Sequence, residues 1–335
     1  MGKLLAFGEV MLRMSPPGRE LLFQSPQLDV WVGGAEANLV TALARLGHDA
    51  AIATLVPDND LGRFAITTLR GHGVDVSRTL SDGDRMALYF VTSGAGLRAT
   101  EVIYDRAGSA FAEASPTAWD WDKLLEGVDR LHLSGITPAL GPKAARSATK
   151  AAEAAWARGI PISFDGNWRG KLWDRWDCDP RAILTQIVCR ADLLFGNHKD
   201  ISLLLGTEFK GDGEDRRSAA AGAAFEAFPA LQIIASTARH VDHVDHHRLS
   251  ARIESREAHV QTDELVLSGI VDRIGGGDAF AAGVLHALRN GGDLADAANN
   301  GLALTALKHS LPGDASLFRQ ADIDAYLRGG LDVRR

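Results

Sequence analysis

The sequence predicts an α/β fold in which a mostly parallel sheet is covered by helices on both faces. Apolar runs of strand length alternate with helical patterns along most of the 335 residues. That length can bury one large α/β core with an appendage, or two domains. Segments 12–32 and 85–106 interrupt the alternation because they are rich in strand formers and lack a helical period.

The N-terminal elements follow from turn signals and periodicity. A buried strand is predicted over Met1–Gly8, with Glu9 at its tip. Gly33 and Gly34 then lead into a helix with apolar residues at helical spacing, which stops at Gly47. A strand at Ala50–Val56 and a helix over 60–72 come next. Arg85–Thr92 and Ala99–Asp105 flank a glycine-containing loop and predict a β-hairpin.

The remaining elements continue the alternation. The predicted strands are Arg130–Ser134, Pro161–Asp165, Leu193–Gly196 and Gln232–Ser236, and the predicted helices are 143–157, Ile183–Arg190, 215–227, 278–290, 293–309 and 321–328. Ligands of such sheets bind beyond the carboxyl ends of the strands. Asp165, Asn197, Thr237 and Gly275 each follow a predicted strand, so we expect one cleft to collect them.

Composition excludes several classes of function. Charged residues make up 24% and the net charge is −7, with no basic tract, so no nucleic-acid partner is expected. The two cysteines, Cys178 and Cys189, form no disulfide framework or metal-ligand spacing. The start of the chain resembles a strand more than a signal peptide, and no apolar run reaches membrane-spanning length. These observations predict a cytoplasmic protein with no membrane partner.

The segment Asp272–Gly283, D-R-I-G-G-G-D-A-F-A-A-G, carries the clearest chemistry. Three glycines at a helix start can present N–H groups to an anion such as a phosphate. Asp278 then lies beside the bound phosphate, where it can accept a proton from an attacking hydroxyl. The alternative is an ordinary turn in which Asp278 caps the helix. The other glycine-rich helix start, Gly33–Gly34, lies roughly 240 residues before this segment, and no P-loop motif occurs. A nucleotide site formed by one short stretch of sequence is therefore not expected.

Together these two glycine-rich segments resemble the signatures of the ribokinase-like (PfkB) carbohydrate kinases. The resemblance runs from Gly8–Glu9 to Gly313–Asp314, although Arg273 and Gly276 depart from the commoner D-T-x-G-A-G-D pattern. The form D-R-I-G-G-G-D-A-F is similar to that of 2-keto-3-deoxygluconate kinases. Three further stretches resemble that subgroup: V-I-Y-D-R-A-G-S-A at 102–110, F-D-G-N-W-R-G-K-L-W at 164–173 and F-G-N-H-K-D-I-S-L-L-L-G at 195–206.

The resemblance implies a ribokinase-like three-layer fold with a small β-sheet lid over the sugar. It divides the chain into an α/β kinase domain (1–11, 33–84 and 107–335) and a lid (12–32 and 85–106). The apolar lid face is either the set Met86, Leu88 and Phe90 or the set Ala87, Tyr89 and Val91. Because both sets are mostly apolar, the outer face needs a partner, and a homodimer formed through the lids is expected.

The resemblance also assigns the site residue by residue. It implies Asp278 as the base, Gly275, Gly276 and Gly277 as the anion hole, and Asp200, in place of the usual Glu, near a Mg²⁺-bound water. A guanidinium fork suits a carboxylate, so Arg106 and Arg169 are expected to bind that group of an acidic sugar. The other sugar-binding residues implied are Gly33, Gly34, Asn38, Tyr89, Tyr104 and Asp314, and the nucleotide-binding residues are Asn167, Asn197, Thr237 and Arg239.

The implied activity is transfer of the ATP γ-phosphoryl group, with Mg²⁺, to the terminal hydroxyl of 2-keto-3-deoxy-D-gluconate. The alternatives are a kinase for fructose, ribose, a tagatose phosphate or a 5-keto-2-deoxy sugar acid, and a non-catalytic sugar-binding regulator. A nucleoside kinase is less expected, because a nucleoside has no carboxylate for Arg106 and Arg169 to bind. The glycines expected after Thr237 are missing, so the phosphate donor stays open, as do the sugar's stereochemistry, a monovalent-cation requirement and the subunit count.

One histidine-rich stretch, H-V-D-H-V-D-H-H at 240–247, invites interpretation as a metal site. Its spacing does not match a tetrahedral ligand set. We therefore predict a solvated loop that binds no metal.

Overall fold

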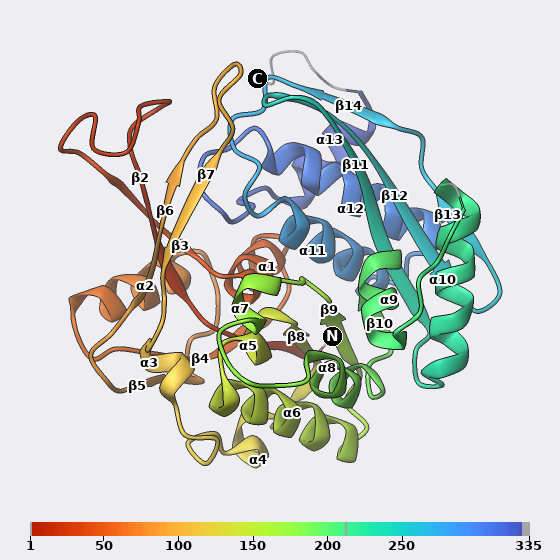
Figure 1. Ribbon diagram of the computed structural model, residues 1–335, viewed down its shortest axis with the longest axis horizontal. Coiled ribbons are helices and arrows are strands. Elements are labelled where there is room, and N and C mark those ends of the chain that lie inside the picture. The colour runs from red at the N-terminus through yellow and green to blue at the C-terminus, as the bar shows by residue number, and fades with distance from the viewer. Residues whose placement is uncertain (1, 212, 330–335) are drawn as a thin grey trace.

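A large, mostly parallel sheet forms the centre of the molecule in the computed structural model, which describes residues 2–211 and 213–329 (Figure 1). The order of its strands is β13-β12-β11-β10-β9-β8-β1-β4-β5, and β14 pairs with β12. The pairings from β11 through to β5 are parallel, and those of β12 with β11, β13 and β14 are antiparallel. A second sheet has the order β3-β2-β6-β7. This confirms the predicted fold class.

The strands have the following bounds: β1 Lys3–Phe7, β2 Met11–Ser15, β3 Asp29–Gly33, β4 Ala50–Val56, β5 Thr79–Ser81, β6 Ala87–Thr92, β7 Glu101–Asp105, β8 Val128–Ser134, β9 Ile162–Asp165, β10 Leu193–Phe195, β11 Ile233–His243, β12 His246–Ser255, β13 His259–Gln261 and β14 Leu265–Ser268. Each strand predicted in the α/β part of the chain is present. Met1, where the first predicted strand began, lies outside the described residues.

The helices have the following bounds: α1 Ala35–Arg45, α2 Asp60–Gly71, α3 Ala110–Glu113, α4 Trp121–Leu124, α5 Ile136–Ala139, α6 Pro142–Ala157, α7 Gly170–Trp173, α8 Pro180–Val188, α9 His198–Leu205, α10 Gly213–Ala227, α11 Gly276–Arg289, α12 Leu294–Lys308 and α13 Gln320–Leu327. The predicted helices end within a few residues of these bounds. The four-residue helices α3, α4, α5 and α7 are too short to give a periodic signal.

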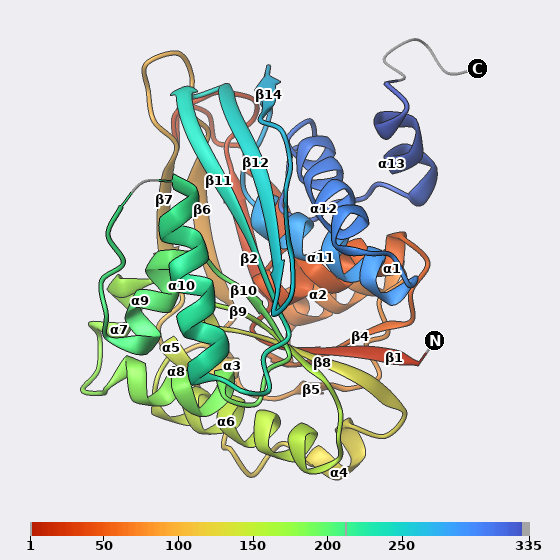
Figure 2. The same cartoon turned by 90° about the vertical axis from the view of Figure 1, so that its right-hand side faces the viewer.

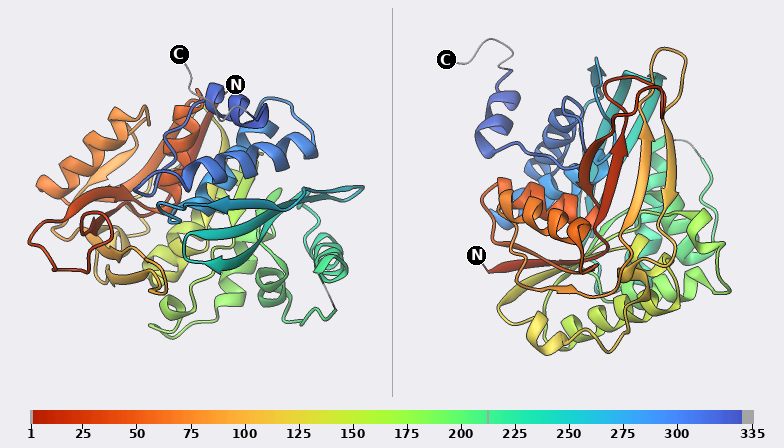
Figure 3. Two further views of the ribbon diagram at one scale, coloured as in Figure 1. Left: turned by 90° about the horizontal axis from the view of Figure 1, so that it is seen from above. Right: turned by 90° about the vertical axis from the view of Figure 1, so that its left-hand side faces the viewer.

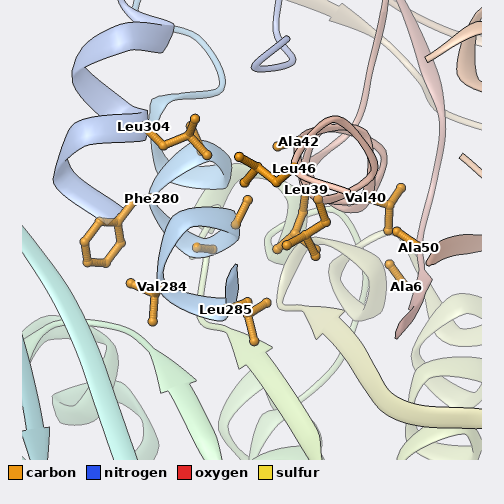
Figure 4. Packing of buried hydrophobic residues seen from close by; sticks show 14 of the residues in the cluster. Ala6, Leu39, Val40, Ala42, Leu46, Ala50, Phe280, Val284, Leu285 and Leu304 are labelled. Carbon is orange, nitrogen blue, oxygen red and sulfur yellow. The ribbon is translucent and has the colours of Figure 1, made fainter. Parts of the chain in front are cut away.

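Helices lie on both sides of the sheet (Figure 2), and each layer is packed against it by a hydrophobic cluster. One contains α1, α11 and α12, and the other contains α6, α8 and α10. In the first layer, Leu39 of α1 and Leu285 of α11 lie in one buried cluster with Ala6 and Ala50 of the sheet (Figure 4). This packing sets the N-termini of α1 and α11 against each other. None of the helices in the described ranges is long and apolar enough to cross a membrane.

The second sheet projects from the α/β body, and Figure 3 shows it from two further directions. It is built from the two segments that interrupt the alternation, and the predicted hairpin is confirmed by the antiparallel pairing of β6 with β7. Ala87, Tyr89 and Val91 form its buried set, together with Met11 and Ile274. The division of the chain into a kinase domain and a lid stays a prediction. Residues 1 and 330–335 of the predicted kinase domain lie outside the described ranges.

The histidine-rich stretch is not a loop, so that prediction was wrong. His240 lies in β11 and His247 in β12, on either side of a turn. The strand pattern was hidden because the exposed end of β11 is polar, and it extends as far as His243 through pairing with β12. Within residues 2–211 and 213–329, no group of three or more His, Cys, Asp or Glu side chains is placed to hold a metal.

Candidate active site

Asp278 lies in the first turn of α11, where two helix N-termini meet. Its Oδ2 atom accepts a hydrogen bond of 2.7 Å from Nδ2 of Asn38, which is in the first turn of α1. Gly275 caps α11 in the left-handed conformation, with φ of 79°. A Cβ atom there would lie 1.7 Å from the carbonyl oxygen of Asp314, so no other residue fits without displacing that segment. Gly275 thus brings the acid, Asn38 and the backbone N–H groups at the start of α11 together.

The charge state of Asp278 is set mainly by burial. Burial raises the pKa of its carboxyl to about 7, the hydrogen bond from Asn38 acts to lower it, and the nearby Asp314 raises it. A carboxyl with that pKa can accept and release a proton near neutral pH. The environment therefore suits Asp278 to general-base catalysis.

A cavity of about 400 Å³ lies between the second sheet and the N-termini of α1 and α11. Most of the residues predicted to bind sugar line it: Gly34, Asn38, Tyr89, Tyr104, Arg106, Arg169 and Asp314, with Gly275, Gly276, Gly277 and Asp278. Gly33 does not line it. A Cβ on Gly33 would come within 2.5 Å of the Tyr89 hydroxyl and the Asp314 carboxyl, so this glycine allows close packing behind the wall.

A second cavity, of about 620 Å³, adjoins the first. Its lining includes three of the predicted nucleotide-binding residues, Asn167, Asn197 and Thr237, and also Asp200. The fourth, Arg239, lines the first cavity instead. Asp165, Asn167, Arg169 and Gly277 line both cavities, which are therefore continuous beside α11.

Near this junction, backbone N–H groups donate to the carboxylates of Asp165 and Asp200. Asn167 has φ of 37°, an uncommon conformation for a residue other than glycine, and its N–H donates to the Asp165 carboxylate. Asp200 and Asn197 form a capping box at the start of α9, with the Asp200 carboxylate accepting the Asn197 N–H. The raised pKa values of Asp165, about 8, and of Asp200 both come mainly from burial.

Arg106 differs from the sequence expectation, in which it offers a free fork to the substrate. Its Nε and Nη2 atoms both donate to Oε2 of Glu9, and the pair is buried. A buried guanidinium without a carboxylate would be costly, and Glu9, just beyond the end of β1, supplies that carboxylate. Arg169 has no ion-pair partner among the described residues, and its Nη1 donates only to the neighbouring Trp168 carbonyl.

Sequence reasoning missed a buried charge network behind the cavity wall. Nη1 of Arg13 lies 2.6 Å from Asp272 Oδ2 and 2.8 Å from Asp314 Oδ1. The Tyr89 hydroxyl donates to the other oxygen of Asp314. Asp314 therefore supports the wall and fixes Tyr89 as well as lining the cavity. The available signal was a lone arginine in the apolar strand M-L-R-M-S.

The aromatic side chains form the part of the cavity wall that comes from the second sheet. The rings of Tyr89 and Tyr104 stack with centroids 5.8 Å apart, and the guanidinium of Arg106 lies 5.8 Å from the Tyr104 ring centre. Tyr104 is 45% exposed and can contact a bound molecule, whereas the Tyr89 hydroxyl is already hydrogen-bonded.

Comparisons with known proteins agree with this arrangement. Residues 1–319 match the family described as pfkB family carbohydrate kinase. The chain is 31% identical over 328 residues to a 2-dehydro-3-deoxygalactonokinase of Haloferax volcanii, covering 98% of this chain and 97% of that protein. It is 33% identical over 208 residues to a 2-dehydro-3-deoxygluconokinase of Thermoproteus tenax, covering 62% of each. The crystal structure of a 2-dehydro-3-deoxygluconokinase from Thermotoga maritima superposes with a TM-score of 0.92 at 32% identity, covering 98% of this chain and all of that one.

Proposed function

Because the chain belongs to the pfkB family of carbohydrate kinases, we propose that it phosphorylates the terminal hydroxyl of 2-keto-3-deoxy-D-gluconate with ATP. The observation that carries the proposal is the position of Asp278, which lines the first cavity next to Gly277, a residue that lines both cavities, and whose carboxylate accepts a hydrogen bond from Asn38. The cavity that Asp278 lines takes the sugar, and the neighbouring cavity takes the nucleotide. Relatives that are named for acidic sugars support the substrate class.

The proposed reaction uses residues of this chain in three roles. Asp278 accepts the proton of the sugar hydroxyl while the hydroxyl oxygen forms a bond to the γ-phosphorus of ATP. The bond between the γ-phosphorus and the oxygen that bridges the β- and γ-phosphates breaks, and ADP leaves. The N–H group of Gly277 faces the charge that develops on the phosphoryl oxygens, whereas the Gly276 N–H donates to the Arg273 carbonyl at 3.3 Å. Arg169 meets the sugar carboxylate, and Arg106, which is already paired with Glu9, contributes at most its remaining Nη1.

The donor side fits a magnesium nucleotide. Burial raises the pKa values of Asp165 and Asp200, and the nearby charge of Arg169 offsets this only in part, so a cation would be favoured beside these carboxyls. Mg²⁺ keeps most of its waters and binds substrate phosphates with one or two carboxylates, so these two acids are the residues that would hold it. Bound there, it would neutralise phosphate charge.

Two further expectations accompany the proposal. The second sheet acts as a lid, through which two subunits form a homodimer. A cytoplasmic location stays a prediction.

The test is an assay of the purified protein with ATP and Mg²⁺ against 2-keto-3-deoxygluconate, its C4 epimer 2-keto-3-deoxygalactonate, fructose, ribose and 5-keto-2-deoxygluconate. We expect the two 2-keto-3-deoxy acids to be phosphorylated most efficiently, since one relative is named for each. Arg169→Ala should raise KM for these acids about 10-fold or more, and Lys171→Ala, at an exposed position two residues along the chain, is the matched control. Preference for a neutral sugar would overturn the substrate assignment.

A further inference from the structure

Three cavities meet at the first turn of α11. Besides the two described above, a third of about 310 Å³ is lined by Thr237, Arg239, Arg273 and Gly276, among others. Gly277 lines all three cavities. Arg239 of β11 and Arg273, in the loop before Gly275, line both the third cavity and the sugar cavity. The guanidinium groups of Arg239 and Arg273 therefore lie where the third cavity adjoins the sugar cavity.

The arginines that this chain buries in its described part, Arg13, Arg106 and Arg252, are matched by carboxylates. Arg13 contacts Asp272 and Asp314, Arg106 contacts Glu9, and Arg252 contacts Glu254 and Glu214. Such pairing is expected because an uncompensated charge is costly when it loses water.

Arg239, which is exposed, and Arg273, which is half-buried, have no such partner although both line the same two cavities. Across residues 2–211 and 213–329, neither guanidinium group has a hydrogen bond or an ion pair with a side chain or a carbonyl. Burial lowers the pKa of Arg239 and the charge of Arg273 lowers it further, as expected for two guanidinium groups that line the same two cavities. Two like charges where these cavities adjoin, next to backbone N–H groups, form a site that is completed by an anion with several oxygens.

We propose that Arg239 and Arg273 together bind the β- and γ-phosphate oxygens of the nucleotide, with Arg273, beside the anion hole, on the phosphoryl group that is transferred. Arg273 is thereby a further catalytic residue. This inference rests on the proposed kinase function and adds a role that the anion-hole glycines cannot fill, because backbone N–H groups carry no net charge. A guanidinium neutralises the charge that the phosphoryl oxygens gain during transfer.

The test compares nucleotides that differ only in their phosphates. ATP, ADP and AMP are titrated by calorimetry, with Mg²⁺ and without sugar, into the wild-type protein and into Arg239→Ala, Arg273→Ala and Arg273→Lys. Each alanine variant should bind ATP about 10- to 100-fold more weakly and AMP within about twofold of wild type, since AMP lacks the contacted phosphates. Arg146→Ala, an exposed position on α6, controls for the lost positive charge.

Kinetics separate direct contact from a structural role. Arg273→Ala should lower kcat, and millimolar guanidine should restore part of it, whereas Arg146→Ala should show neither effect. Arg273→Lys should recover some ATP affinity. Equal weakening of ATP and AMP, or a rise in KM for the sugar alone, would overturn the inference. Since the titrations need no sugar, a protein that binds ATP in this way but phosphorylates no sugar on the panel would fail the proposed function and not the inference.

Discussion

Asp278 illustrates how position converts a common residue into a base. The same carboxyl in water would be ionised far below neutral pH and would be a weak proton acceptor. Burial raises its pKa to about 7, and Asn38 limits the rise by donating to the charged form. The glycine run predicted the acid and the anion hole. It could not predict the pKa, because that depends on Asn38 and Asp314, which are distant in the sequence.

The first prediction concerns this base. Asp278→Asn keeps the size of the side chain and an oxygen that can accept from Asn38, but it cannot take a proton. We expect turnover to fall roughly 100-fold or more while ATP affinity stays within a few-fold of wild type. Steady-state kinetics and calorimetry measure the two quantities. Near-normal turnover would remove Asp278 from the mechanism.

The second prediction concerns the pH dependence of the wild-type enzyme. The base must be deprotonated, so kcat/KM should fall about tenfold per pH unit below about 7 and level off above it. Asn38→Ala removes the hydrogen bond that lowers this pKa, and the acid limb should therefore move to higher pH. A pH–rate profile of both proteins is the measurement. A limb that stays in place in the variant would show that another group titrates.

The third prediction concerns stability and Asp165. Burial, followed by the charge of Asp278, raises the pKa of Asp165 from 3.8 to about 8. The folded protein thus holds this proton more tightly than the unfolded chain, which stabilises the fold fully below pH 3.8, and the stabilisation is lost as the pH rises from 3.8 to 8. Asp165→Asn cannot ionise, so it should raise Tm relative to wild type by about 3 °C at pH 8 and by little at pH 4.5.

Thermal unfolding without Mg²⁺ or nucleotide is the appropriate measurement, because a bound cation would itself stabilise the ionised carboxylate. Asp263→Asn, at an exposed position, is the control and should leave Tm unchanged at both pH values. A shift that is equal at pH 4.5 and pH 8 would mean that Asp165 does not titrate in this range.

At the scale of the elements, α12 supports the loop that begins at Asp272 and leads into α11. Lys308, in the last turn of α12, is fully buried, and its Nζ donates to the carbonyl oxygens of Asp272 and Leu311, each at 3.2 Å. Asp272 begins the loop that carries the three glycines. Helix periodicity predicted α12 well, but a lysine at its end would be expected to lie in water, and only the packed structure reveals its partners.

The fourth prediction follows from this contact. Lys308→Met keeps the length of the side chain but leaves two buried carbonyls without their donor and removes a positive charge close to Asp272 and Asp314. We expect the free energy of unfolding to fall by about 2–3 kcal/mol, as measured by urea denaturation. Lys150→Met, on the exposed side of α6, should cost little. A loss as small as that of the control would show that water replaces the ammonium.

Element boundaries reveal what a sequence pattern can and cannot predict. The central parallel strands were recognised because burial on both faces makes them continuous apolar runs. β11 extends seven residues beyond the predicted Ser236, because its exposed half is held by pairing with β12. The length of such a strand depends on the strand that pairs with it, which a local sequence pattern does not show. In the same way, the orientation of Arg106 depends on Glu9, which is distant in the sequence.

At the scale of the whole molecule, the second sheet presents two different faces. The row Trp31, Arg13, Tyr89 and Tyr104 is defined by strand pairing and includes residues that line or support the sugar cavity. The adjacent row Val30, Met14, Phe90 and Ile103 lies on the opposite face, because side chains alternate along strands. Val30 is 40% and Ile103 is 54% exposed. An apolar row across four strands is unusual on a surface that meets only water.

The fifth prediction is that this outer row is the contact of a homodimer, which leaves each sugar cavity facing its own α/β body. Light scattering at low micromolar concentration should give twice the chain mass. Ile103→Lys places a charge in the row and should shift the protein toward monomer, whereas Val266→Lys, at an equally exposed position on β14, should not. Tyr104 is next to Ile103 and lines the cavity, so loss of the dimer should also raise KM for the sugar by loosening this wall. A wild-type monomer with full activity would refute the dimer and leave the kinase assignment standing.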